Sequence, residues 1–140
     1  MSASGVISAR YSGGDAFRYT IRDHIDVVDQ PVDDGGEDRG PTPTELLVAS
    51  LVTCMGHYAQ RFLRRNDIDV EGLELTAHFE MSPDRPARVA HVEVDVALPG
   101  DIPAPLRAAL ERVINSCTVH NTLHHPPEVT LTLKPEADAA

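Results

Sequence analysis

Aromatic residues, lysine and cysteine are all scarce in this chain. Only 4% of the 140 residues are aromatic, there is no Trp, and Lys134 is the single lysine. The formal net charge is −10 and no basic stripe is present, so we expect no nucleic-acid partner. No apolar run approaches the roughly 20 residues of a membrane span, and the N-terminus lacks the pattern of a signal peptide. We therefore expect a cytoplasmic protein with no membrane partner.

The chain has only two cysteines, Cys54 and Cys117. Cys54 lies in the apolar run LLVASLVTCMGHY (46–58), and Cys117 lies far downstream in VINSCTVHNTL (113–123). In the cytosol a stable structural disulfide is disfavoured, and a cysteine pair is more often catalytic, redox-active or metal-binding. The two thiols are the first candidates for chemistry, beside the simpler interpretation that each is a small buried apolar residue.

The composition and the local patterns predict one α+β domain. Hydrophobic residues make up 41% and charged residues 24% of the chain, which is ordinary for a soluble globular protein, and the length fits a single domain over residues 1–140. The periodicity of apolar residues gives the expected order of elements. We expect short strands within 5–30, a loop over 30–41, a helix over 42–65, an antiparallel hairpin over 72–98, a second helix over 103–117 and a closing strand over 128–133.

The first expected helix has a well-defined start. Thr42 is a good N-cap, Pro43 suits the first helical position, and Glu45 falls three residues after the cap, which together form a capping box. Apolar residues then recur on one helical face: Leu47, Leu51, Cys54, Tyr58 and Phe62. The second helix has a similar stripe that ends at Cys117. If the two helices pack against each other, the two sulfur atoms can meet inside the core.

Two segments, GGEDRGPTPTELLVASLVTC (35–54) and CTVHNTL (117–123), resemble the OsmC/Ohr family of osmotically inducible and organic hydroperoxide resistance proteins. The resemblance runs from about Asp26 to Leu133, and the stretch PTELL is more similar to the OsmC-like branch. It implies an OsmC-like α+β fold with antiparallel sheets and two main helices, in which two chains intertwine into a homodimer. We expect neither a cofactor nor a metal.

The same resemblance implies a thiol-dependent peroxidase. Cys54 would attack an organic hydroperoxide and become a sulfenic acid, and Cys117 would condense with it to a disulfide that a dithiol reductant opens again. In the hydroperoxide branch an Arg and a Glu near the first cysteine assist it. A buried thiol needs such a cation, because burial raises its pKa whereas the nucleophile is the thiolate.

Two departures from the hydroperoxide branch concern these assisting residues. Where that branch has a Glu after the Pro that opens the helix, this chain has Thr44, and Glu45 comes one residue later. Where it has an Arg after a Gly pair, this chain has Asp15. Arg18 is the best substitute for the cation, ahead of Arg22, with a solvated strand charge as the alternative. Glu45 is both a candidate catalytic residue and a helix cap.

Two further interpretations remain open at this point. Cys117 with His120, His124 and His125 has the ligand chemistry of a zinc site, but the spacing matches no standard zinc pattern, and ordinary loop histidines explain it as well. The fold could also hold a small apolar ligand in a dimer crevice without redox chemistry. Both departures from the hydroperoxide branch favour that second alternative.

Overall fold

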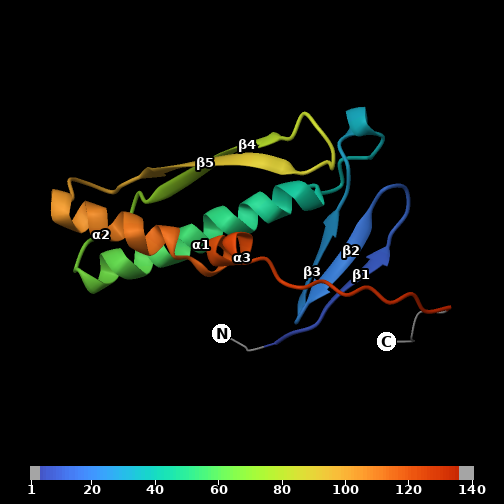
Figure 1. Ribbon diagram of the computed structural model, residues 1–140, viewed down its shortest axis with the longest axis horizontal. Coiled ribbons are helices and arrows are strands. Elements are labelled where there is room, and N and C mark those ends of the chain that lie inside the picture. The colour runs from blue at the N-terminus through green and yellow to red at the C-terminus, as the bar shows by residue number, and fades with distance from the viewer. Residues whose placement is uncertain (1–3, 136–140) are drawn as a thin grey trace.

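The computed structural model describes residues 4–135, arranged around one long helix (Figure 1). The elements are β1 (Ile7–Tyr11), β2 (Phe17–Ile21), β3 (His24–Val28), the short 3-10 helix η1 (Val32–Asp34), α1 (Pro43–Arg65), β4 (Glu74–Met81), β5 (Val89–Ala97), α2 (Ala104–Asn115) and α3 (Thr118–His124). The strands form two small antiparallel sheets, β1-β2-β3 and β4-β5. This mixed content confirms the predicted α+β fold. Within the described residues, no helix combines the length and the apolarity needed to cross a membrane.

The long helix α1 is the centre of the arrangement. It contacts the hairpin β4–β5 as well as α2 and α3. Figure 1 shows the hairpin along one side of α1 and the sheet β1-β2-β3 standing beyond the N-terminal end of that helix. The two sheets therefore have different environments: the hairpin has a helix on one face, whereas the three-stranded sheet stands apart from the helices.

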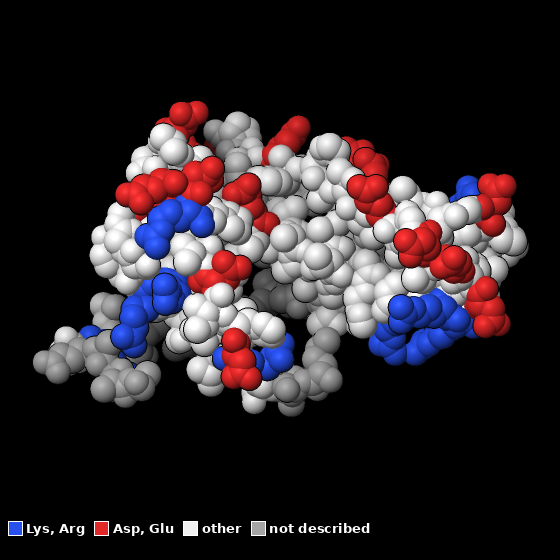
Figure 2. Space-filling model, turned by 180° about the vertical axis from the view of Figure 1, so that it is seen from behind, with Lys and Arg blue, Asp and Glu red and all other residues white. Residues whose placement is uncertain are grey.

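The surface charge is mostly negative, as the composition requires. Figure 2 shows acidic side chains spread over the upper part of one face, and basic side chains in separate groups that form no continuous stripe there. Separate cations in a chain of net charge −10 produce no extended positive field.

The start of α1 is the predicted capping box. The backbone N–H of Glu45 donates to Thr42 Oγ1 at 3.1 Å, and the backbone N–H of Thr42 donates to Glu45 Oε1 at 2.8 Å. Pro43 occupies the first helical position, where its missing N–H has no intrahelical partner to lose. At the other end Arg64 and Arg65 lie in the last turn, where cations interact favourably with the helix dipole.

The buried face of α1 lies next to the predicted stripe. Its buried residues are Val48, Leu51, Met55, Ala59 and Leu63. Cys54, Tyr58 and Phe62 are only partly buried and pack at the border of the core, and Leu47 is 46% exposed. The core continues through Ile102, Leu110, Ile114 and Cys117. Cys54 therefore sits where the core meets the surface, whereas Cys117 is inside.

Two sequence expectations were wrong. The second helix ends at Asn115 and does not reach Cys117, which is the N-cap residue of a separate helix, α3. Residues 128–133 are described but form no strand, although every second residue is apolar. A strand needs a hydrogen-bonded partner, and within residues 4–135 this segment pairs with neither sheet.

A buried carboxylate fixes the loop between β3 and α1. Asp29 is 1% exposed, and its carboxylate accepts the backbone N–H groups of Gln30 at 2.7 Å, Arg39 at 3.1 Å and Glu37 at 3.3 Å. Burial acts to raise the pKa of Asp29, but these three donors and the Arg39 charge outweigh it, so the pKa is lowered. Gly36 lies in the same loop, where a Cβ atom would come within 2.0 Å of the Gln30 carbonyl oxygen.

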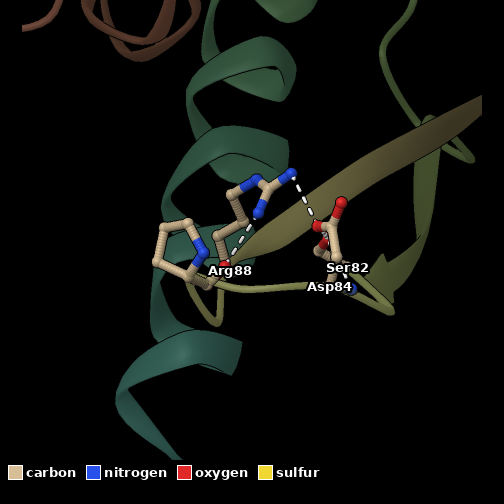
Figure 3. A network of polar contacts seen from close by, with 4 residues as sticks. Ser82, Asp84 and Arg88 are labelled. Carbon is tan, nitrogen blue, oxygen red and sulfur yellow. Dashed lines mark hydrogen bonds and ion pairs between the residues drawn. The ribbon is translucent and has the colours of Figure 1, made fainter.

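A polar network closes the turn between β4 and β5 (Figure 3). The Ser82 hydroxyl donates to the Asp84 carboxylate, and the Arg88 guanidinium forms an ion pair with the same carboxylate at 3.1 Å. Arg88 also donates to the Pro86 carbonyl at 2.8 Å. The Ser82 hydrogen bond, followed by that of Arg88, lowers the pKa of Asp84. These side chains are exposed, so the network shapes the turn more than it stabilises the fold.

Candidate functional site

The two cysteines come together although they are distant in sequence. Cys54 projects from the middle of α1 and is partly buried, and Cys117 at the start of α3 is 0% exposed. Cys54 packs against the core cluster that contains Cys117, its side chain interacts with the Cys117 thiol and raises the pKa of that thiol, and both cysteines are free thiols. A disulfide between them requires the two Cα atoms to lie within roughly 7 Å.

Cys117 is held by the start of α3. Its backbone is extended, with φ −65° and ψ 152°, and its Sγ accepts the backbone N–H of His120 at 3.3 Å. Sulfur thus takes the capping role that a serine or threonine oxygen usually has. One residue later, Thr118 Oγ1 lies 2.9 Å from Tyr58 Oη of α1. This hydrogen bond joins the two helices that position the thiols.

The environment of Cys117 keeps its thiol protonated. Burial raises the pKa of Cys117, and the hydrogen bond and charge interaction with Cys54 raise it further, whereas the backbone N–H groups of His120 and Val119 lower it. The net pKa lies above the ordinary value for a thiol. At neutral pH Cys117 therefore has an S–H proton that it can donate to the neighbouring sulfur.

The structure does not bring the other two predicted site residues to the thiols. Arg18 is exposed on β2, opposite Arg10 on β1 and Val27 on β3, in the sheet beyond the N-terminal end of α1 (Figure 1). Glu45 lies in the first turn of α1, and its carboxylate is engaged in the capping box. Neither contributes to the pKa shift of Cys117.

A groove of about 610 Å³ lies between α1, β5 and α3. Its lining is mostly apolar, with three histidines and one asparagine: Leu47, Val48, Leu51, Met55, Val89, Ala90, His91, Val92, Val94, Asn115, His120, Leu123 and His124. A second space of about 340 Å³ shares Met55, Val94 and Asn115 with it, so the two adjoin. Sequence reasoning did not find this groove, because three elements that are distant in the chain form it.

The predicted histidine cluster is only partly assembled. Nε2 of His120 and Nε2 of His124 lie 2.9 Å apart, one helical turn from each other on α3. His125 is the C-cap of that helix, and the Cys117 sulfur is occupied by the His120 N–H. Among residues 4–135, no group of three or more His, Cys, Asp or Glu side chains is spaced to hold a metal ion.

The family model of the OsmC-like protein family matches residues 35–132, which include both cysteines, and the chain belongs to this family. No curated protein matches it in sequence. A solved structure from Psychrobacter arcticus 273-4 has a TM-score of 0.77 at 22% identity, over 87% of this chain and 90% of that one. The structure of an OsmC-like protein from Mycoplasma pneumoniae has a TM-score of 0.73 at 16% sequence identity. The match covers 90% of this chain and 91% of that one. The structure of an organic hydroperoxide resistance protein OsmC from Legionella pneumophila has a TM-score of 0.67 at 17% sequence identity. The match covers 86% of this chain and 88% of that one.

Proposed function

We propose that this protein is a thiol-dependent peroxidase that reduces organic hydroperoxides. The observation that supports it most is the packing of two free thiols at one place in the core, Cys54 at its edge and Cys117 fully buried, where the two side chains interact. The structural similarity to an organic hydroperoxide resistance protein supports the choice of substrate class. The groove beside α1 has the mostly apolar lining that a small apolar ligand requires, although neither cysteine belongs to that lining.

The exposure of the two sulfurs assigns their roles. A peroxide can reach Cys54, which is partly exposed, but not Cys117, which is 0% exposed. After the Cys54 thiol loses its proton to solvent, the thiolate attacks the terminal peroxide oxygen. The O–O bond breaks, Cys54 becomes a sulfenic acid, and the alkoxide takes a proton to leave as an alcohol. The peroxide is reduced by two electrons and the sulfur is oxidised by two.

Cys117 has two functions in this scheme. Before the attack, it keeps an S–H proton that it can donate to the Cys54 sulfur. After the attack, the Cys117 sulfur displaces hydroxide from the sulfenic acid, which leaves as water with the Cys117 proton, and a disulfide forms. A dithiol reductant then opens the disulfide by exchange and is itself oxidised. Rapid condensation protects Cys54 from irreversible oxidation.

We also propose that two copies assemble into a homodimer, because the described chain leaves apolar strand residues uncovered. Tyr11 on β1 is 63% exposed and Ile25 on β3 is 61% exposed. After α3, the alternating residues Val129, Leu131 and Leu133 are 85%, 80% and 88% exposed. An extended apolar segment needs both a sheet edge and a covered face, and a second copy can supply both. A sedimentation experiment that finds only monomer at micromolar concentration would contradict this assembly.

Assembly also bears on the role that we assign to Arg18, which is to stabilise the Cys54 thiolate. Arg18 and Arg10 lie directly opposite each other, and like charges in that position repel, so this pair favours a nearby anion. Neither arginine forms an ion pair within residues 4–135. Because their sheet stands beyond the end of α1, a second copy must bring the guanidinium to Cys54.

The decisive experiment measures turnover of cumene hydroperoxide with a dithiol reductant. We expect wild-type protein to consume the peroxide catalytically and to lose two hydrogen atoms by intact mass when the reductant is omitted. Cys54→Ser changes one atom and should abolish both results. Absence of turnover in wild type, with Cys54→Ser behaving identically, would refute the proposal.

A second candidate function is the binding of a small apolar ligand without redox chemistry. The observation that favours it is the placement of Arg18 and Glu45: within residues 4–135, neither acts on the Cys117 thiol, and Glu45 is engaged in the capping box. In that case an apolar fluorescent probe would bind in the groove with the same affinity in wild type and in Cys54→Ser, and no peroxide would be consumed.

A further inference from the structure

Two histidines on α3 face each other across one helical turn. The Nε2 atoms of His120 and His124 are 2.9 Å apart, and the ring centroids are 4.6 Å apart. Both rings line the groove between α1, β5 and α3. The proposed peroxidase reaction uses neither ring.

A single proton shared between the two rings does not satisfy the hydrogen-bonding capacity of both histidines. A neutral imidazole has one N–H, so only one proton can lie between the two Nε2 atoms, and protonation of both rings would place two cations in contact. The other ring nitrogen of His120, Nδ1, is buried and has no hydrogen-bond partner within residues 4–135. Two imidazole nitrogens only 2.9 Å apart can instead share a positively charged ion.

We propose that His120 and His124 form an open binding site for a divalent transition-metal ion of the zinc type. Imidazole nitrogen is a preferred ligand of such ions, and histidines one turn apart on a helix are a common way to supply two ligands. Two nitrogens at about 2.0–2.1 Å from a tetrahedral ion lie roughly 3.3 Å apart, so the observed pair needs only a small widening. No third protein ligand is preformed in the described chain, so water fills the remaining positions.

A bound ion would stabilise α3, the helix that has Cys117 as its N-cap. An ion bound to the third and seventh residues of α3 links its two turns and stabilises the helix whose first N–H groups face the Cys117 sulfur. Metal binding thus holds Cys117 in its place beside Cys54. This inference does not depend on the peroxidase proposal, because the ligands are not the reacting thiols.

Cobalt(II) is the probe of choice, because it replaces zinc and reports its ligands by colour. We expect reduced wild-type protein to bind one cobalt ion per chain, with d–d absorption and without the near-ultraviolet band of thiolate coordination. His124→Gln, at an exposed position, and His120→Ala should each weaken binding at least about tenfold. His125→Ala removes the neighbouring imidazole outside the pair and should bind cobalt as tightly as wild type.

Two results would overturn the proposal. The first is unchanged cobalt affinity in His124→Gln with the far-ultraviolet circular dichroism of wild type, which shows that the variant is folded. The second is a thiolate-to-cobalt band that disappears in Cys117→Ser, which would place the ion on the thiols. Neither readout requires peroxidase activity, so failure of the metal site and failure of the proposed reaction are distinguishable.

Discussion

Replacement of Cys117 by serine or alanine separates its two functions. Serine retains a side-chain acceptor for the His120 N–H, so the cap of α3 remains, but it cannot form a disulfide. Alanine removes both the cap and the thiol. Loss of a side-chain N-cap typically costs about 0.5–2 kcal/mol, so we expect Cys117→Ala to lower the free energy of unfolding by that amount relative to Cys117→Ser. For a chain of this length, 1 kcal/mol lowers the melting temperature by about 2–5 °C.

The same two variants should be alike in chemistry. With the resolving thiol absent, one equivalent of hydroperoxide leaves Cys54 as a sulfenic acid, which a dimedone-type reagent traps and intact mass detects. Excess peroxide then drives Cys54 to the sulfinic acid, whereas wild type forms the disulfide. Equal stability of the two variants would refute the capping role of the sulfur. Full turnover of Cys117→Ser with the dithiol reductant would refute its role as the resolving thiol.

Three further predictions follow from single contacts. Tyr58→Phe removes the hydrogen bond to Thr118 and should cost about 0.5–1.5 kcal/mol by urea unfolding, and a coupling energy with Thr118→Val near zero would contradict the contact. The lowered pKa of Asp29 stabilises the fold above the unfolded-state pKa of about 3.9, so stability should fall as acid protonates this carboxylate, and less steeply in Asp29→Asn. Glu45→Gln should retain the capping box and near-wild-type peroxidase activity; a large loss of activity with unchanged stability would assign the carboxylate to catalysis.

The helices and strands that depend on neighbouring residues in the chain could be predicted from the sequence. The capping box at Thr42 and Glu45 identified the start of α1, and strict alternation identified the hairpin β4–β5. The sequence also indicated that the two cysteines could meet, although for an incomplete reason, because Cys117 arrives as a helix cap and not on the stripe of α2. The small polar residues around it, Ser116 and Thr118, are the signal of a helix break that could have revealed this.

Features that depend on distant contacts could not be predicted in the same way. The alternation in residues 128–133 is real, but whether it becomes a strand depends on an edge elsewhere. The groove arises from helices and a strand that are distant in the chain and meet only in three dimensions. The placement of Arg18 relative to Cys54 likewise depends on how the three-stranded sheet packs, which the residues of β2 do not specify.

The Cys117 sulfur both caps α3 and belongs to the thiol pair. The oxidation state of the cysteines is therefore coupled to the stability of that helix. In the proposed disulfide, the Cys117 sulfur would be a poorer acceptor for the His120 amide than the free thiol is, and the first turn of α3 would loosen. By reciprocity, whatever stiffens that turn favours the reduced pair. The exchange rate of the His120 backbone N–H should thereby show whether the proposed disulfide has formed.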